Sequence, residues 1–561
     1  MSDESTERSL RTRLEHWLPL LVVCSAMLIV VIDTSMMTVA ISAIVADLDT
    51  SVTAVQAAIS LYALVMAAFV MVGAKLGNVY GLRRMYLVGL GIYTTGTILA
   101  AISWNIYVLW LGWSIIEGLG AAILLPLSYA ILPLVYRETT ERALAFGILT
   151  GVQAAAAAVG PIVGGTLTTF FTWRWGFGLE ALIAVPTFLL ALRLTEHRPE
   201  PDGSIDGVGA ALSVTGLSLV TIGVLLSGHY GWWKALRPVE IAGTEVSLLG
   251  LSPTPILVAA GIALLVGFVH WQYKQVRVGG PTLVRTSLFG NGGYLGGLST
   301  YFIAWVALGG ILFVVPVFLQ GGLGYNAFQT GIALLPFSMA VFAVSLGTAR
   351  LTATLGGKRL IQAGILIVAV GLALLYTASA PSMTLVDMAL PMLVQGVGIG
   401  LIMANIVNLT LSTVEADETM EASGGSMAVN WMGTSIGTAV MGSFLLTSVF
   451  GTVVDRVLTS AGLAATATER RELIVKLEDT TEYITEQEKT AFVESLPPAV
   501  QQDLLSIIDV ATVQGFRNTV LLLGLFVVAL ALTSSFLPAG KTGDVPMETT
   551  PVDPVPDRAD D

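Results

Sequence analysis

Three acidic residues lie inside long apolar segments of the sequence, where charge is not expected: Asp33, Glu117 and Glu180. An ionisable side chain in the middle of a membrane is costly, so each is a candidate functional group. At 1.5 Å per helical residue, Asp33 would lie about 22 Å along its segment and Glu117 about 17 Å along its own. A carboxyl shielded from water can exchange a proton near neutral pH and attract a cationic ligand. The alternative is packing, with Asp33 bonded to a neighbouring helix and Glu117 neutral.

Amide side chains inside the apolar segments are further candidates for a central cavity, although each could equally bond one helix to the next. They are Gln153, Gln395, Asn405 and Asn430. One cysteine, Cys24, and four separated histidines offer no disulfide and no metal centre. We expect no metal and no cofactor, and the lack of a catalytic triad or nucleotide motif argues against an enzyme.

The composition is that of a membrane protein. Of the 561 residues, 54% are hydrophobic and 12% are charged, whereas soluble domains carry about 25% charged residues. Apolar runs of about 20 residues predict helices that cross the bilayer, because the backbone must satisfy its own hydrogen bonds in lipid. The net charge of −12 gives no reason to expect nucleic acid binding.

We predict an all-α integral membrane protein with fourteen spans. Their expected limits are 18–45, 54–74, 84–103, 106–135, 143–168, 175–194, 207–228, 254–272, 294–320, 328–349, 360–379, 384–411, 423–447 and 516–537. With the N-terminus in the cytoplasm, most of the 27 lysines and arginines fall on the cytoplasmic side, as the positive-inside rule requires. Both termini are therefore expected to be cytoplasmic.

The sequence also repeats itself. At a constant offset of 275 residues, Gly81 aligns with Gly356, Arg83 with Lys358 and Arg84 with Arg359. The same offset carries span 18–45 onto 294–320, which predicts two parallel six-helix halves.

The expected organisation divides the chain into seven parts. A cytoplasmic N-terminus (1–17) is followed by the first half (18–194), two inserted helices (207–272) and five helices of the second half (294–447). An extracytoplasmic helical loop (448–512), the last helix (516–537) and a disordered acidic tail (538–561) complete the chain.

Several motifs resemble those of the major facilitator superfamily, and within it the 14-helix drug:proton antiporter family. VVIDTSMMTVAIS surrounds Asp33, AKLGNVYGLRR follows the second span, SIIEGLGAAILLP lies in the fourth, GVQAAAAAVGPIVGG in the fifth and WRWGFGLEALIAVP at the sixth. The resemblance covers residues 17–538 and implies the major facilitator fold and secondary transport.

In the loop motif Gly-x-Leu-Ala-Asp-Arg-x-Gly-Arg-Lys, the aspartate is replaced by Asn78, while Gly81, Arg83 and Arg84 match. The family uses this loop to lock its two halves in the outward-open state, so the resemblance implies a weaker lock here. Plain positive-inside topology would also account for the two arginines.

In the fourth-helix motif, Ser114 replaces the membrane arginine that the family assigns to proton coupling, and Glu117 replaces a glutamine. The resemblance therefore implies an altered coupling scheme in which Glu117 takes part. In the sixth-helix motif, Glu180 lies at or beside a polar position.

The fifth-helix motif ends in Gly-Pro-x-x-Gly-Gly, which is typical of antiporters of the family and comprises Gly160, Pro161, Gly164 and Gly165. Small residues allow close helix approach, and the proline kinks the helix, so we expect a pliable outer gate against the other half. A generic packing face is the alternative.

We expect a multi-pass transporter of the plasma membrane that exports amphipathic or cationic small molecules in exchange for protons or another cation. It would act as a monomer in the lipid bilayer, without a cofactor or nucleic acid partner. A major facilitator transporter of another cargo (lipid, metabolite or small solute) and a non-transporting scaffold or sensor are the alternatives.

Overall fold

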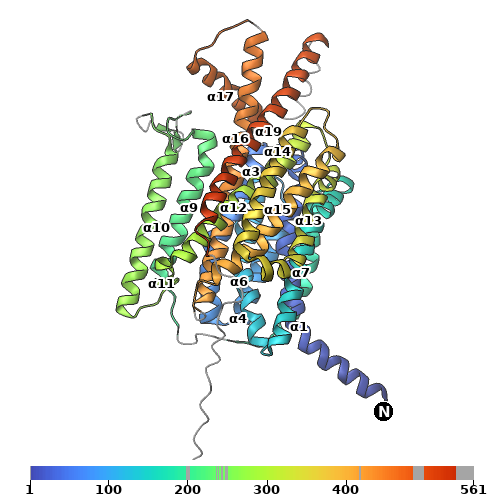
Figure 1. The fold of residues 1–561 in the computed structure, drawn as a ribbon, viewed down its shortest axis with the longest axis vertical. Coiled ribbons are helices and arrows are strands. Elements are labelled where there is room, and N and C mark those ends of the chain that lie inside the picture. Colours follow the sequence, from blue (N-terminus) through green and yellow to red (C-terminus); the bar gives the residue numbers. More distant parts are fainter. Residues whose placement is uncertain are drawn as a thin grey trace, which may run out of the picture.

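The computed structural model describes residues 2–197, 203–235, 237, 239–241, 244–246, 250–415, 418–460, 462–483 and 498–538. Within these ranges the chain is almost entirely helical, and long helices run side by side as an upright bundle (Figure 1). The predicted disordered tail, 538–561, lies outside the described residues apart from Pro538.

The helices of the predicted first half come first along the chain, and the two predicted inserted helices follow them. The first half comprises α1 (Ser2–Met37), α2 (Ile41–Asp47), α3 (Val52–Tyr80), α4 (Leu82–Ala101), α5 (Ile106–Leu109), η1 (Trp110–Glu117), α6 (Gly118–Val135), α7 (Thr139–Phe170) and α8 (Arg174–Ala191). The insertion comprises α9 (Gly207–Tyr230), β1 (Val239–Ile241), β2 (Thr244–Val246), α10 (Pro253–Val278) and α11 (Ser287–Gly290). The two short strands pair antiparallel, with Val239 opposite Val246.

The second half begins at residue 292. It comprises α12 (Gly292–Val317), η2 (Phe318–Gly322), α13 (Ala327–Leu355), α14 (Gly357–Ala378), α15 (Leu385–Leu411), α16 (Thr419–Ser460), α17 (Ala467–Tyr483) and α19 (Pro498–Ser534). α16, α17 and α19 project beyond the bundle at the end opposite the N-terminus (top of Figure 1), which we call the cap end. The predicted loop 448–512 is thus mostly helical where it is described, with a turn and irregular chain over 462–466, and with 461 and 484–497 outside the described residues.

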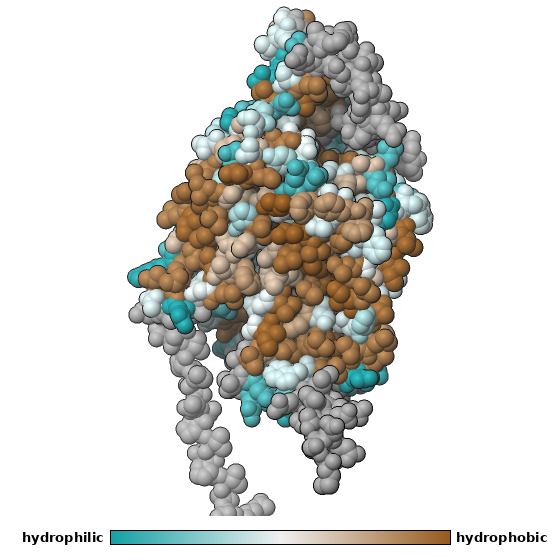
Figure 2. Space-filling model, turned by 90° about the vertical axis from the view of Figure 1, so that its right-hand side faces the viewer, coloured by the Kyte–Doolittle hydropathy of each residue, from teal (hydrophilic) through white to brown (hydrophobic). Residues whose placement is uncertain are grey.

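Thirteen helical segments of the described chain are long and apolar enough to cross a membrane. A broad apolar belt covers the middle of the face in Figure 2, with hydrophilic residues towards both ends. The predicted span 84–103 forms α4, which is not among the thirteen. An all-helical membrane fold is confirmed, and the count of fourteen spans stays a prediction.

The first predicted span, 18–45, is broken in the structure between α1 and α2. Gln320 from η2 satisfies backbone groups at this break: its amide nitrogen donates to Val39 O at 2.9 Å, and its Oε1 accepts from Ser42 N at 3.0 Å. Helix ends leave such backbone groups without partners. A side chain from the other half therefore supplies the hydrogen bonds that are missing at this break.

The repeated loops perform the same task in both halves. Gly81 and Gly356 have φ of 107° and 84°, in the region that favours glycine. Two residues later, Arg83 donates to Leu192 O at the end of α8 (2.5 Å), and Lys358 donates to Leu537 O just beyond α19 (2.7 Å). In each half, a basic side chain at the start of the third helix donates a hydrogen bond to the end of the last helix. The C-terminus of a helix favours such a cation because of the helix dipole.

The loop motif in the first half has an additional partner that sequence reasoning missed. The carboxylate of Glu196 accepts hydrogen bonds from Arg83 N at 3.1 Å and Arg84 N at 3.2 Å, at the start of α4. A Cβ on Gly81 would lie 2.4 Å from this carboxylate. Asn78, at the end of α3, is buried. Glu196 thus places an anion at the N-terminus of α4, which stabilises the helix. The aspartate that this motif lacks cannot supply that stabilisation.

At the cap end, α17 is tied to the end of α16. Arg470 donates two hydrogen bonds to Asp455, at 2.5 and 2.7 Å. The Thr466 backbone N–H and hydroxyl, both 2.8 Å from the carboxylate of Glu469, cap α17 and hold the pKa of that carboxyl below its usual range. These exposed contacts give the cap a defined start but little stability.

Topology can be tested with single cysteines in a Cys24→Ala background. Because positive charge is expected to stay inside, Thr459→Cys at the cap end should react with membrane-impermeant maleimide in intact cells. Thr354→Cys, exposed at the opposite end of the bundle, is the matched control and should react only after lysis. The reverse labelling pattern would show that the chain is inverted.

Candidate functional site

The three membrane acids lie together. One carboxylate oxygen each from Asp33, Glu117 and Glu180 lies within 4.8 Å of the other two, and all three side chains are fully buried. They come from α1, the end of η1 and α8. Helices that are distant along the chain thus bring three acids into one cluster, which we call the acid cluster.

Each carboxyl of the acid cluster accepts one hydrogen bond from a neutral donor. Trp113 Nε1 donates to Asp33 Oδ2 at 3.0 Å, and Thr97 Oγ1 donates to Glu117 Oε2 at 2.9 Å. The third bond runs from the Tyr93 hydroxyl to Glu180 Oε2 at 3.2 Å. The other oxygen of each carboxyl has no partner among the described residues, so the cluster has capacity for a further proton or cation.

Electrostatics limit how many of these carboxyls can be ionised together. Two unit charges 4.8 Å apart repel by about 3 kcal/mol even at an effective dielectric constant of about 20. The donors carry no charge that would offset this repulsion. The three carboxyls of the acid cluster therefore cannot all be ionised at once when the cluster is closed to water.

Close packing of α4 against η1 positions Glu117. A Cβ on Gly96 would lie 2.3 Å from Glu117 N, and one on Gly112 would lie 2.8 Å from Ala100 N. Only glycine permits this approach, which brings Thr97 within hydrogen-bond distance of Glu117. η1 is a π-helical segment, a feature often found at functional sites.

The Ser114 hydroxyl, which occupies the position of the family's membrane arginine, donates to Ala58 O of α3 at 2.8 Å. It therefore ties η1 to its neighbour and supplies no counter-charge to the acid cluster.

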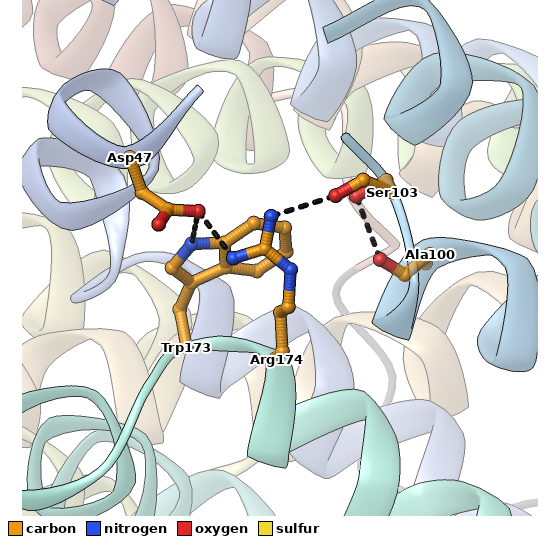
Figure 3. Close-up of polar contacts among 5 residues, drawn as sticks. All are labelled: Asp47, Ala100, Ser103, Trp173 and Arg174. Atoms are coloured by element: carbon orange, nitrogen blue, oxygen red, sulfur yellow. Dashed lines mark hydrogen bonds and ion pairs between the residues drawn. The ribbon is translucent and has the colours of Figure 1, made fainter. Parts of the chain in front are cut away.

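The start of α8, which carries Glu180, is held by the contacts drawn in Figure 3. Arg174 pairs with Asp47 of α2 and donates to Ser103 O beyond α4 at 2.7 Å. The guanidinium lies 4.5 Å from the centre of the Trp173 ring, and Trp173 Nε1 also donates to Asp47 at 3.0 Å. The aromatic and basic residues of the sixth-helix motif thus fix the position of α8 relative to α2 and α4.

Aromatic rings connect the acid cluster to the second half. Trp113, which bonds Asp33, has its ring 5.7 Å from that of Tyr62 on α3. Tyr62 in turn lies 6.0 Å, edge to face, from Trp431 on α16. Two rings, those of Trp113 and Tyr62, thus lie between Asp33 and Trp431 of the other half.

The four candidate cavity amides have different environments. Gln153 on α7 bonds the hydroxyl of Tyr129, and Asn430 on α16 donates to the hydroxyl of Tyr301 at 3.3 Å. Both amides are partly exposed although they lie well inside their helices.

The other two amides are buried within the second half. Asn405 accepts from Thr352 Oγ1 at 2.6 Å and donates to Leu401 O, which makes it a bond between helices. Gln395 packs beside Gly371, and its Nε2 has no partner among the described residues.

The Gly-Pro-x-x-Gly-Gly motif contacts two different neighbours. A Cβ on Gly160 or Gly164 would meet α1, at Ser35 and Met36 of the same half. A Cβ on Gly165 would lie 2.5 Å from Ala327 O on α13 of the other half.

Pro161 O lies on the same side as Gly165, where it would be 2.4 Å from a Cβ on Gly331 of α13. Gly165 and Pro161, rather than Gly164, therefore contact the other half.

Polar contacts between the halves gather towards the cap end. Besides Gln320, Gln56 on α3 donates to Ala439 O at 2.8 Å, and Ser435 donates to Ser60 O at 2.6 Å. Phe328 N donates to Thr169 Oγ1 at 3.0 Å, beside the α7 motif. The halves are thus joined at this end.

Sequence reasoning missed several of these residues. Gln56 and Gln320 each lie close to the end of an apolar run, and Trp113 lies four residues before Glu117. A search for polar side chains near span ends would have found the two glutamines. Glu196 gives no such signal, because its role depends on a contact with a loop more than a hundred residues away.

The family model described as Major Facilitator Superfamily matches residues 23–442. The chain is 30% identical to the multidrug resistance protein Stp of Mycobacterium tuberculosis over 68% of this chain and 67% of that protein. It is 28% identical to the cephamycin export protein CmcT of Amycolatopsis lactamdurans, over 75% and 83% of the two chains. With the multidrug efflux pump LfrA of Mycolicibacterium smegmatis it shares 25% identity, over 81% and 85%.

The fold is also that of a solved peptide transporter, with a TM-score of 0.58 and 13% identity over 93% of this chain and 96% of that chain. At this identity the likeness concerns the fold alone. The long apolar helices, the two halves and the match to the family model agree. The chain is a multi-pass membrane transporter and belongs to the Major Facilitator Superfamily.

Proposed function

We propose that this transporter exports amphipathic cationic small molecules in exchange for protons, with the acid cluster as the coupling site. The observation that carries the proposal is the meeting of Asp33, Glu117 and Glu180 within 4.8 Å, fully buried and bonded by neutral donors. Such a cluster can be neutralised by protons or by a cation, but not left fully charged.

Exchange follows from competition for the same carboxyls. A cationic substrate that enters from one side displaces a proton from a carboxyl of the cluster into the water on that side, and the carboxylate that remains pairs with the cation. Protons from the other side then displace the substrate. Because either occupant neutralises the cluster, the inward proton gradient can drive the substrate outward without a nucleotide.

Coupling also requires that a change in the protonation of the acid cluster alters the contact between the halves. Protonation of Asp33 weakens its bond from Trp113, whose ring packs on Tyr62 and through it faces Trp431. Tight glycine contacts have few intermediate arrangements. A small shift at Asp33 can therefore favour one of two packings.

Aromatic side chains near the middle of the bundle support an amphipathic cargo. Tyr129 in the first half and Tyr301 in the second carry the amide partners Gln153 and Asn430, and Trp305 packs edge to face with Tyr301. Rings with a polar edge suit flat, partly apolar cations. The names of the relatives refer to cephamycin export, multidrug resistance and multidrug efflux, which supports the export of small molecules.

Asp33→Asn is expected to insert and fold normally but to lose gradient-driven transport, because an amide cannot exchange the proton. The loss should be about 5- to 150-fold, the range of typical coupling free energies. Substrate-stimulated proton release and counterflow in proteoliposomes measure the effect, with Glu138→Gln, an exposed acid at the start of α7, as control. Wild-type coupling in Asp33→Asn would remove this residue from the scheme.

Glu117→Gln is expected to bind substrate with a flatter pH dependence than the wild type between about pH 5 and 8. In the wild type, rising pH ionises the cluster and strengthens binding of a cation. The amide removes one titrating group, so the slope of log Kd against pH should fall by up to one proton. Binding to purified protein across this pH range measures the slope. An unchanged profile would assign Glu117 to packing.

Gly165→Ala is expected to slow turnover more than it weakens binding, because its Cβ would lie 2.5 Å from a backbone oxygen of α13. Such overpacking costs about 1–3 kcal/mol and disfavours the arrangement in which α7 and α13 are in contact. Gly151→Ala on the same helix, whose Cβ would meet nothing within 4 Å, is the matched control. Equal maximal rates for the two variants would show that the Gly165 contact does not limit the cycle.

A further inference from the structure

α10 presents a continuous apolar stripe that ends in a row of basic residues. Ile256, Ala259, Ile262 and Val266 lie on one exposed face of this helix. At 100° per residue, the same face continues through a second set of exposed side chains. These are His270, Tyr273, Lys274 and Arg277, and they line a surface recess of about 380 Å³.

The position of this recess along α10 corresponds to a membrane surface. Trp233, 73% exposed, accepts a hydrogen bond from Ser252 N through its carbonyl at the start of α10. Exposed aromatic residues favour the interfaces of a bilayer. Tyr273, 41% exposed, follows Ser252 by a length of helix of about 31 Å, close to the thickness of the hydrocarbon core. Lys274 and Arg277 therefore lie at the level of lipid headgroups.

Neighbouring residues of α9 and α10 support the position of Lys274 in the recess. The buried carboxylate of Asp206 at the start of α9 accepts from Trp271 Nε1 at 2.9 Å and from Gln272 Nε2 at 2.7 Å. The Trp271 ring in turn lies 5.2 Å from the ammonium group of Lys274, within cation–π distance. Lys274 thus has a fixed aromatic support, unlike a lysine on an unsupported helix face.

α10 is also well placed to meet lipid. It buries the smallest share of its residues among the thirteen candidate spans, and it stands at the edge of the bundle (left in Figure 1). Gly267, between the apolar stripe and the basic row, has open space where a Cβ would be. An acyl chain can follow the stripe past this glycine while its phosphate reaches the recess.

We propose that the recess of His270, Tyr273, Lys274 and Arg277 binds the phosphate headgroup of an anionic phospholipid, whose acyl chains lie along the apolar stripe of α10. Two cations at headgroup level supply the attraction, and Lys274 is supported by the Trp271 ring. The stripe selects a lipid over a free phosphate ion. This site is separate from the acid cluster. The proposal applies whichever side of the membrane the basic end of α10 faces.

The test compares the binding of phosphatidylglycerol and phosphatidylcholine with equal acyl chains to the purified full-length protein in detergent, by native mass spectrometry. Lys274→Gln with Arg277→Gln should weaken phosphatidylglycerol binding by about fivefold for each charge removed. Phosphatidylcholine binding should not change. Lys274→Arg with Arg277→Lys, which keeps both charges, should retain the preference for phosphatidylglycerol.

The matched control is Arg137→Gln with Arg193→Gln, two exposed bases outside the recess. This pair removes the same charge and should leave lipid preference at the wild-type value. Equal loss in the control and the recess variant, or no loss in the recess variant, would overturn the proposal. Displacement of the lipid by millimolar inorganic phosphate alone would also overturn it and would assign the recess to a free anion.

Discussion

Three carboxyls buried in the membrane core impose the constraint on which the rest of this transporter depends. An isolated carboxylate in lipid is costly, and three within 4.8 Å repel one another strongly. The protein surrounds them with Trp113, Thr97 and Tyr93, which donate hydrogen bonds but add no charge. The cluster therefore cannot carry three negative charges at once while it is closed to water.

The glycine contacts follow from the same need. Gly96 and Gly112 bring α4 against η1 and thereby place a hydroxyl on Glu117, while Gly165 brings α7 against α13 of the other half. In a membrane, helices associate through close packing because lipid offers no hydrophobic drive. Contacts at backbone distance are either made or lost. The same kind of packing, glycine against the backbone of a neighbouring helix, thus both surrounds the acids and forms the contact between the halves.

The internal repeat ties the helices of each half together in the same way. Arg83 and Lys358 each bind the end of the last helix of their own half, so each half is closed on itself. Glu196 adds an anion at the start of α4, where the family motif has lost its aspartate. The helices of each half are thus tied to one another at this end of the bundle. α9 and α10 flank them at the edge of the bundle (Figure 1).

Apolar runs and acids at mid-span were sufficient to predict from sequence the membrane fold and three candidate coupling residues, because lipid permits few backbones and few charges. The family was predicted from the resemblance of five motifs, which are short and continuous in the sequence. The pairing at an offset of 275 residues also emerged from sequence, since it repeats along the chain. Tertiary structure alone decided that Asp33, Glu117 and Glu180 meet, that Gly165 rather than Gly164 faces α13, and that Gln320 completes the break after α1. These outcomes depend on how helices far apart in the chain rotate and pack. A periodic pattern shows which residues share a helix face, but only the distances between helices determine which faces meet.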